Sequence, residues 1–578
     1  MCYYSKGVFF TLYIITGGTM NYSEDKTLNG KVYLTLLRSG AAALYEQIKT
    51  VNELNVFPIP DGDTGDNMYH TFYGGVKAVG SDLDGEIGIG RISATISDGM
   101  LLNARGNSGV ILSQLFFGIA NGLKPFDTAT VADLANAFRE GVKTAYHAVV
   151  KPVEGTILTV ARESFDYALE RVTDGSTLSS FFGDILTRMK TSLEHTPELL
   201  PVLKEAGVID SGGAGLYYIA DGMLKAINGA PVYSEEKEVA LGKDLDFSLF
   251  TKDSVMTYGY CTEFLLQLQT AKTDTDAFDV QTIIDYLNTI GDSIVAFKTG
   301  SVIKVHVHTL TPQKALDFCQ KFGEFLTVKI ENMTLQHNET LKEKEREEVA
   351  FTVAEKPRKK YGVVAVASGK GLVDMLRELG ADEIVDGGQT NNPSSEDFIT
   401  AFGKVNADCI FVFPNNGNII LTAKQAANMY NGSEIIVIET KNIGDCYAAL
   451  SMADFSSDNP YDVENILREN MQGVTTGMIT TSIRDASLNG VDIKKDDYIG
   501  FTDKTMLASS PDKLTAFKLL CEKLGIENNP FFIVVYGKSV TEDEKSKVKE
   551  YTGGFPNSEF YEIQGDQEVY DFILIFQQ

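Results

Sequence analysis

Residues 55–68 have the sequence Asn55-Val56-Phe57-Pro58-Ile59-Pro60-Asp61-Gly62-Asp63-Thr64-Gly65-Asp66-Asn67-Met68. Two prolines stiffen the approach to this acidic loop, and two glycines permit positive φ and the close approach of a ligand. Asp61 and Asp63 are crowded together, so their like charges repel unless a cation lies between them. Oxygen ligands of this kind suit Mg²⁺, completed by water and substrate phosphates. The same residue types are ordinary in a surface turn, so this loop alone leaves both interpretations open.

The segments on either side have the periodicity of helices. Apolar residues recur at intervals of three or four over 93–103, 108–122, 130–148, 177–194 and 213–227. Glycine-bearing turns separate such segments: Pro60-Asp61-Gly62-Asp63, Ala104-Arg105-Gly106-Asn107, Glu154-Gly155-Thr156 and Asp210-Ser211-Gly212-Gly213. We therefore predict an all-α domain over residues 20–230 that carries four polar loops.

These loops lie where phosphate groups are commonly bound. Gly106-Asn107-Ser108-Gly109 directly precedes a predicted helix, and the loops at 154–156 and 210–213 also lie at predicted helix starts. Backbone N–H groups at a helix N-terminus can hold phosphate, although polar residues there can also act only as caps. Four such loops in one helical domain favour the binding interpretation.

Length and charge limit the remaining possibilities. At ~100–200 residues per domain, 578 residues predict three or four domains. The 51 basic and 79 acidic residues give a net charge of −28, which argues against nucleic acid or an anionic membrane surface as the main partner. No apolar stretch of ~20 residues occurs, so we predict no transmembrane segment. Six scattered cysteines without a C-x-x-C pair fit a reducing cytoplasm.

Residues 1–19 form an unusual N-terminus. An apolar run over 8–15 follows a single lysine, but an A-x-A-like cleavage site is missing, so the signal-peptide pattern is incomplete. We expect Met20 to be the real start, with 1–19 an over-called start or a disordered tail.

The rest of the chain predicts two further domains. Residues 231–338 mix strands, at 264–269, 293–297 and 302–309, with a helix at 280–290, which indicates a small α+β domain. Residues 339–360 are dense in charge and predict a linker. From 361 to 578 we predict an α/β domain with a parallel sheet, because strands at 361–367, 383–386, 407–413 and 434–438 alternate with helices at 371–379, 394–405 and 418–430.

Polar loops follow two of these strands. Residues 386–397 form a turn that leads into a helix, with Ser394 or Ser395 as its cap, and residues 414–418 follow the strand at 407–413. Ligands of open α/β sheets bind at such strand ends, although both loops can also serve only to cap helices. The common phosphate loops are absent: Gly537-Lys538-Ser539 lacks the leading glycine of a P-loop, since position 532 is Phe532.

Val305-His306-Val307-His308 alternates with a period of two, so both imidazoles lie on one face of a strand. Such a pair suits Zn²⁺, and Cys261 is an available third ligand 45 positions earlier. The alternative to a zinc site is that the two histidines contact only solvent or other core residues.

Four segments together resemble the ATP-binding L-subunit domain of dihydroxyacetone kinases: Asn55 to Gly65, Ala104 to Val110, Lys151 to Ile157, and Asp210 to Gly213. The specific form N-V-F-P-[IV]-P-D-G-D-T-G resembles the catalytic subunit of bacterial fatty acid kinase, and this resemblance covers nearly the whole chain from Met20. It implies a multidomain chain with an all-α helical-barrel kinase domain, a small α+β middle domain and an α/β DegV-like C-terminal domain.

The resemblance also implies site residues. Asp61 and Asp63 would bind Mg²⁺, as a pair of ions that grip the phosphates of ATP, and Asn55 stands near a further Asp of dihydroxyacetone kinases. The residues implied to line the nucleotide are Thr64, Gly65, Asn67, Asn107, Ser108, Gly109, Thr156 and Gly212. Independently of the resemblance, we expect the guanidinium of Arg105 to stabilise the negative charge of the phosphoryl group during its transfer. Asp66 departs from the small residue expected there, so its carboxylate either strengthens metal binding or faces solvent.

In the middle domain the implied site is Cys261, His306 and His308 on one Zn²⁺, with the fourth position open.

The resemblance further implies a cytoplasmic kinase component that phosphorylates the carboxylate of a fatty acid presented by a DegV-type binding protein, giving acyl phosphate and ADP. The DegV-like domain would dock that partner, and a homodimer is compatible with this build. Two alternatives stay open: a dihydroxyacetone-kinase-like phosphotransferase for another small substrate, and a non-catalytic nucleotide- or zinc-binding scaffold for DegV-type proteins.

Overall fold

The computed structural model describes residues 21–54, 59, 62–79, 88–149, 151–232, 260–275, 278–287, 289–299, 301–332, 358–389, 391–503, 505–555 and 558–577. The chain divides into two compact units, one of residues 1–235 together with 357–578 and the other of residues 236–356. Residues 1–19, Asn55, Asp61 and most of the predicted linker at 339–360 lie outside the described residues.

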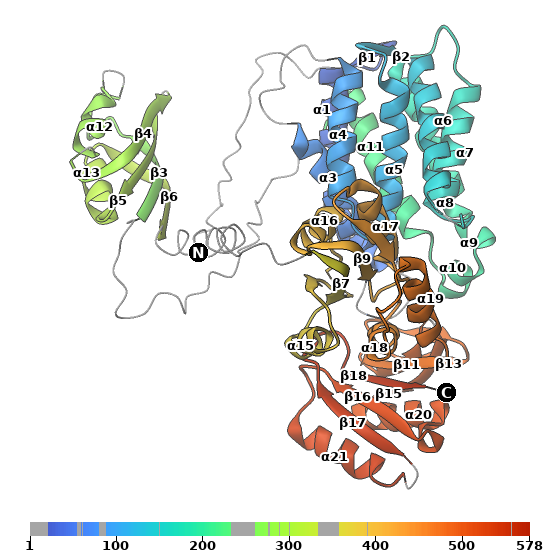
Figure 1. The fold of residues 1–578 in the computed structure, drawn as a ribbon. Coiled ribbons are helices and arrows are strands. Elements are labelled where there is room, and N and C mark those ends of the chain that lie inside the picture. Colours follow the sequence, from blue (N-terminus) through green and yellow to red (C-terminus); the bar gives the residue numbers. More distant parts are fainter. Residues whose placement is uncertain are drawn as a thin grey trace. The chain divides into compact units, whose positions relative to one another are not determined.

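The N-terminal part of the first unit is a bundle of helices (Figure 1). Its elements are β1 (Thr27–Asn29), α1 (Gly30–Glu46), α2 (Ile48–Glu53), α3 (Thr64–Ala78), α4 (Ile89–Leu102), α5 (Gly106–Leu123), β2 (Thr128–Thr130), α6 (Val131–Ala148), α7 (Ile157–Glu170), α8 (Leu178–Glu194), α9 (Thr196–Leu199), α10 (Pro201–Ala206) and α11 (Ser211–Ile227). The apolar stripes of the long helices form one buried core, which confirms the predicted all-α domain. Asn29, Thr130 and Thr177 accept backbone N–H groups and so fix the starts of α1, α6 and α8.

Helix α5 begins earlier than predicted. The four residues from Gly106 to Gly109 form its first turn, so the prediction that they precede the helix was wrong. The helix begins where the extended backbone of Arg105 ends. The first N–H groups of a helix have no partner within the helix, so Gly106, Asn107 and Ser108 carry donors free of the helix ladder, whereas the N–H of Gly109 already donates to the carbonyl of Arg105 over 3.1 Å.

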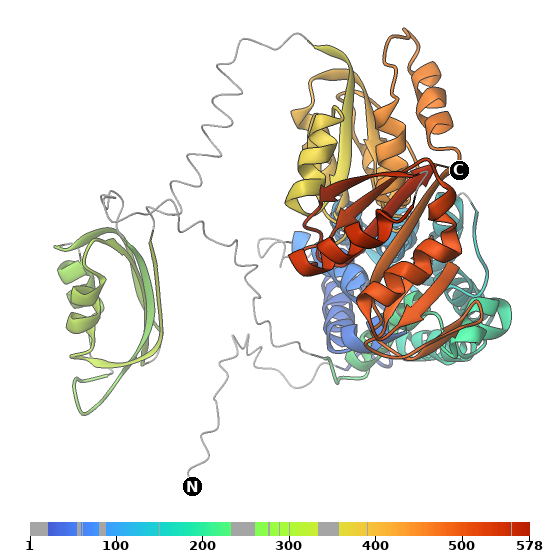
Figure 2. The ribbon, with the colours of Figure 1, turned by 90° about the horizontal axis from the view of Figure 1, so that it is seen from below.

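The second unit is a four-stranded antiparallel sheet with two helices on one face (Figure 2). Its elements are β3 (Tyr260–Leu268), α12 (Gln281–Leu287), β4 (Gly291–Thr299), β5 (Val302–Thr309), α13 (Pro312–Cys319) and β6 (Gly323–Asn332), with the strand order β4-β5-β3-β6. Buried residues of both helices pack against Phe264, Val305 and Val307, which confirms the predicted α+β fold.

The C-terminal part of the first unit begins with a parallel sheet in the order β10-β9-β7-β8. It contains β7 (Lys359–Ala367), α15 (Lys370–Glu378), β8 (Glu383–Asp386), α16 (Ser395–Lys404), β9 (Ala407–Phe413), α17 (Ile420–Met429), β10 (Glu434–Val437), α18 (Ile443–Ser451) and α19 (Pro460–Asn470). The parallel sheet confirms the prediction, and its central strands β7 and β9 are buried over most of their length, as continuous apolar runs require. Strand β7 begins at Lys359, inside the predicted linker.

A second sheet, which the sequence analysis did not assign, follows in the order β15-β14-β11-β18-β16-β17. Its pairs are antiparallel except for β16 with β17. The elements of this region are β11 (Val474–Thr481), β12 (Ala486–Leu488), β13 (Val491–Ile493), β14 (Tyr498–Thr502), β15 (Thr505–Ser510), α20 (Lys513–Leu524), a 3₁₀ turn (Ile526–Asn528), β16 (Phe531–Tyr536), α21 (Glu542–Thr552), β17 (Glu559–Gln564) and β18 (Phe572–Gln577).

Among the described helices, none combines the length and the apolar character needed to cross a bilayer. Four cysteines in the described part of the chain are free thiols in buried positions: Cys319, Cys409, Cys446 and Cys521.

Candidate functional site

The N-termini of α3, α7 and α11 are linked by hydrogen bonds, and the residue before α5 is bonded to the middle of α3. Ser211 Oγ at the start of α11 donates to Thr64 Oγ1 at the start of α3 over 3.3 Å. The carboxylate of Asp210 accepts the N–H groups of Gly213 in α11 and Ile157 in α7. The N–H of Arg105, which precedes α5, donates to Thr71 Oγ1 of α3 over 3.2 Å. Helix N-termini carry partial positive charge, so this convergence favours an anionic ligand.

Asp63 lies at the start of α3 and beside the C-terminal part of the unit. Its carbonyl accepts the N–H of Asn67 over 2.8 Å, while its carboxylate accepts a hydrogen bond from Asn392 Nδ2 and does not cap the helix. Asp63 and Thr64 are half-buried, and Asn67 is buried. Asp61 and Asn55, the other predicted Mg²⁺ ligands, lie outside the described residues.

Asn52 fixes the first turn of α3 and was missed by the sequence analysis. Its Oδ1 accepts the N–H of Gly65, and its Nδ2 donates to Asp66 Oδ2, both over 2.7 Å. The half-buried carboxylate of Asp66 is therefore oriented by this amide. A Cβ atom at Gly65 would lie 2.5 Å from the carbonyl oxygen of Ile48, so the close approach of α2 requires glycine.

The first turn of α5 lies directly against α3. Gly106 has a φ of +57°, and a Cβ atom there would lie 2.6 Å from Asn67 Nδ2. At Gly109 a Cβ atom would lie 2.3 Å from Thr71 Oγ1, the hydroxyl that donates to the carbonyl of Asn67 over 2.6 Å. The predicted nucleotide residues Asn67, Asn107, Ser108 and Gly109 are thus brought together at two adjacent helix starts.

The starts of α7 and α11 complete this arrangement. Thr156 precedes α7, and its hydroxyl donates to the carbonyl of Val153 over 2.7 Å. Gly212 is buried in the first turn of α11. Burial raises the pKa of Asp210 to about 6, against the lowering effect of the two N–H groups that it accepts.

His70 and Arg105 border the same region. Burial, together with the nearby Arg105 guanidinium, lowers the pKa of His70, while Asp66 acts in the opposite direction. Arg105 Nη1 donates to the carbonyl oxygen of Asn392 over 3.0 Å, so the guanidinium contacts the C-terminal part of the unit. Its assignment to the transferring charge stays a prediction.

A second contact surface for this site comes from the loop after β8. Asn392 is 2% exposed, its Nδ2 donates to Asp63, and its Oδ1 has no hydrogen-bond partner in the described structure. Ser394 caps α16, as predicted for one of two serines, and pairs with Arg105 in a single β-bridge. Asn392 lies 329 positions after Asp63, and the only sequence signal for it was a polar loop at a strand end.

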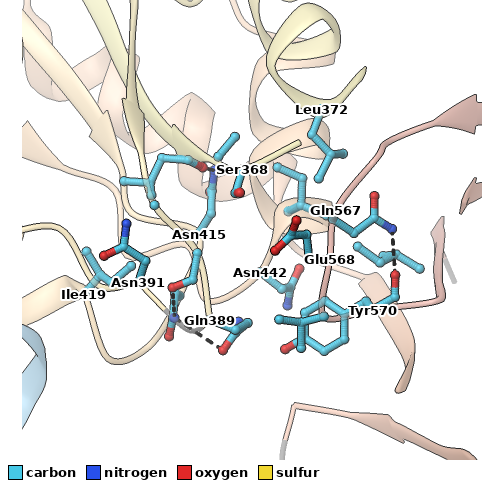
Figure 3. Close-up of a pocket in the computed structure, with 18 of the residues that line it drawn as sticks. Ser368, Leu372, Gln389, Asn391, Asn415, Ile419, Asn442, Gln567, Glu568 and Tyr570 are labelled. Atoms are coloured by element: carbon cyan, nitrogen blue, oxygen red, sulfur yellow. Dashed lines mark hydrogen bonds between the residues drawn. The ribbon is translucent and has the colours of Figure 1, made fainter. Parts of the chain in front are cut away.

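The C-terminal part also contains a cavity of about 270 Å³ at the carboxyl ends of β7, β8 and β9 (Figure 3). Both polar loops of the sequence analysis line it, with Gln389 and Asn391 from one and Asn415 and Asn416 from the other. The described lining includes Asp386 and Glu568 but no Lys, Arg or His. It therefore offers amide groups but no cationic partner for a carboxylate.

In the second unit the backbone register brings the predicted zinc residues onto paired strands. Cys261 of β3 lies opposite His308 of β5, and His306 lies two positions before it. The side chains of all three lie outside what the structure describes, so the zinc site stays a prediction. Among the described side chains, no group of three His, Cys, Asp or Glu residues is close enough to hold a metal ion.

Three family models match the chain. They are the DAK2 domain over residues 58–225, the middle domain of FakA-like fatty acid kinases over 257–340, and the C-terminal domain of FakA-like fatty acid kinases over 362–577.

Full-length relatives agree with these models. A protein of Staphylococcus saprophyticus is 35% identical and protein YloV of Bacillus subtilis is 34% identical, each over 95% of this chain and 99% of its own. Among solved structures, the fatty acid binding protein DegV of Bacillus subtilis aligns with 38% of this chain and 100% of its own, at 13% identity and a TM-score of 0.29. From its full-length relatives and its three domain matches, the chain belongs to the FakA-like family of fatty acid kinases.

Proposed function

We propose that this chain is the ATP- and Mg²⁺-dependent catalytic component of a two-component fatty acid kinase. It transfers the γ-phosphoryl group of ATP to the carboxylate of a fatty acid presented by a DegV-type binding protein. The observation that carries the proposal is the family membership together with the hydrogen bonds that join the N-termini of α3, α7 and α11 and hold the start of α5 against α3.

The reaction needs charge neutralisation more than acid–base chemistry. A fatty acid carboxyl, with a pKa of roughly 4–5, is ionised at neutral pH, so its oxygen attacks the γ-phosphorus without a general base. The bond from that phosphorus to the bridging oxygen breaks, and ADP leaves with the electron pair. The task is to bring two anions together and align them.

The described residues suit that task. The N–H groups of Thr64 and Asp66 in α3 and of Gly106, Asn107 and Ser108 in α5 are proposed donors for phosphate oxygens, since those of Gly65, Asn67 and Gly109 already have partners. Asp63, with the proposed ligand Asp61, offers the hard oxygen atoms that Mg²⁺ prefers. Two buried amide oxygens near these turns, Asn107 Oδ1 and Asn392 Oδ1, have no hydrogen-bond partner among the described residues and are further candidate ligands. Mg²⁺, when bound, would neutralise the phosphate charge.

The cavity in the C-terminal part supports a delivered substrate. Its described lining has no cation to pair with a fatty acid carboxylate, and Asp386 and Glu568 add negative charge. We therefore assign the lipid pocket to the separate binding protein and the docking of that protein to the C-terminal part. Cys261, His306 and His308 are proposed to hold one Zn²⁺, because the register of β3 and β5 pairs the backbone of Cys261 with that of His308.

The test is a turnover assay with purified full-length protein, ATP and Mg²⁺. ADP release is measured with oleate alone and with oleate loaded on a DegV-type protein, and acyl phosphate is trapped as the hydroxamate. We expect turnover only with the loaded partner. Tight ATP binding without turnover on any lipid would favour the scaffold, and turnover on dihydroxyacetone would favour the other kinase class.

Variants separate catalysis from partner binding. Asp61→Asn and Asp63→Asn should lower turnover about a hundredfold or more and leave binding of the DegV-type protein unchanged. Loss of partner binding with unchanged turnover would contradict the assignment.

A further inference from the structure

Asn392 is a buried side chain whose hydrogen bonding is incomplete. It belongs to the loop between β8 and α16, it is 2% exposed, and its Oδ1 has no partner in the described structure. A buried polar atom without a partner costs roughly 1–3 kcal/mol, so such atoms are rare unless a ligand satisfies them. The other half of the same amide, Nδ2, donates to the carboxylate of Asp63.

Several contacts hold this amide at the kinase site. Arg105 Nη1 donates to the carbonyl of Asn392 over 3.0 Å, and the N–H of Ser395 donates to the carbonyl of Ala104 over 3.2 Å. Ile59 of the acidic loop is buried in the hydrophobic cluster of the C-terminal part. The loop after β8 is therefore held by hydrogen bonds to Asp63, which precedes α3, and to Ala104 and Arg105, which precede α5.

Glycine at position 106 lies beside this amide and leaves room for the neighbouring amide of Asn67. A Cβ atom there would lie 2.6 Å from Asn67 Nδ2 and 3.4 Å from Asn392 Nδ2. The amides of Asn67 and Asn392 thus both lie at the start of α5, and Asn392 also contacts the carboxylate of Asp63. An amide oxygen is a hard ligand of the kind that Mg²⁺ accepts.

We propose that Asn392 is a residue of the nucleotide site, offering its Oδ1 to the Mg²⁺–ATP complex at the acidic loop. The inference rests on the proposed function and adds to it, because the ATP site then contains a residue from the C-terminal part of the chain. Docking of the C-terminal part and binding of Mg²⁺–ATP must then strengthen each other, since linkage between two binding equilibria is reciprocal.

The experiment measures ATP affinity of the full-length protein by calorimetry, once in excess Mg²⁺ and once in EDTA. The readout is the dissociation constant in EDTA divided by the dissociation constant in Mg²⁺. This ratio reports how much the metal strengthens ATP binding, and it does not report the general integrity of the interface. Asn392→Ala should reduce this ratio about tenfold, as expected for the loss of one contact to a charged group. Asn392→Asp keeps an oxygen atom and should retain a ratio at least as large as the wild type.

Gln425→Ala is the matched control. Gln425 joins the same two parts of the chain, since its Oε1 accepts from Gln114 Nε2 over 2.9 Å and its Nε2 donates to the carbonyl of Leu101 over 2.8 Å. It does not contact Asp63 in the described structure, so this variant should leave the ratio unchanged.

A wild-type ratio in Asn392→Ala would overturn the inference and leave the kinase assignment standing. Absence of ATP binding in the wild type would overturn both. A measurement on the wild type alone adds a second test: Mg²⁺–ATP should slow hydrogen exchange at residues 391–397 as well as at 63–67. Protection confined to 63–67 would contradict the role of Asn392.

Discussion

Asp210 should make the stability of the protein depend on pH in a direction unusual for an aspartate. Its carboxylate joins the starts of α7 and α11, and burial raises its pKa from 3.8 to about 6. In the unfolded chain the group titrates at its ordinary value, so between these two pH values the folded protein binds more protons than the unfolded one. The stability that Asp210 contributes is therefore fully present below pH 3.8 and is lost as pH rises through 6.

The size of the effect follows from the shift. A difference of about two pKa units corresponds to about 3 kcal/mol, at about 1.4 kcal/mol per unit. This is an upper value, because Asp210 as a residue is half-buried and solvent access lessens the cost of its charge.

The substitution Asp210→Asn removes the titration and keeps an acceptor oxygen for the N–H of Gly213. Relative to the wild type, the variant should gain up to about 2–3 kcal/mol of stability on going from pH 4 to pH 8. Any change in hydrogen bonding adds an offset that does not vary with pH. Urea unfolding of both proteins, without nucleotide, at several pH values from 4 to 8 measures this difference. Parallel curves for the two proteins would refute the burial of a titrating carboxylate at this position.

Three further predictions concern the candidate sites. Asp63→Asn should lower fatty-acid-dependent ADP release about a hundredfold or more, measured beside unchanged far-UV circular dichroism, and activity near wild type would remove Asp63 from the site. Gly106→Ala should destabilise the protein by about 1–3 kcal/mol in urea unfolding, because the φ of +57° and the contact with Asn67 both oppose a Cβ atom, whereas Gly403→Ala, which has open space, should not. Cys261→Ser should lose the zinc measured by elemental analysis, whereas Cys319→Ala, a buried free thiol of the same unit, should keep it; equal zinc in both variants would contradict the proposed ligand.

Local patterns account for much of the fold. The period of three to four residues predicted the helices of 20–230, and continuous apolar runs such as 407–413 predicted the buried parallel strands. These features depend on the residues of one segment, so they can be recognised without knowing its neighbours. The second sheet was not assigned, although its strands of five to eight residues are longer than β8 and β10, which have four. Its pairing joins strands distant in sequence, as β11 with β18, and such pairing leaves no local pattern.

In the candidate site, too, some residues could be predicted from local sequence patterns and others could not. Asp63, Thr64 and Asn107 carry chemistry that their own segments display, as glycine-rich turns at helix starts. Asn52 and Asn392 carried no such pattern. An asparagine is equally common in a plain turn, and only its contacts distinguish the two cases.

The helix periods, the acidic loop and the family pattern were thus available from the chain as written. The sequence did not show the contact of Asp63 with Asn392, which lies 329 positions away. It also did not show the raised pKa of Asp210. Both depend on packing between distant segments, because desolvation and hydrogen bonding are set by whatever lies within a few ångströms of an atom. Folding brings those neighbours together, and the sequence does not show which distant residues will become neighbours.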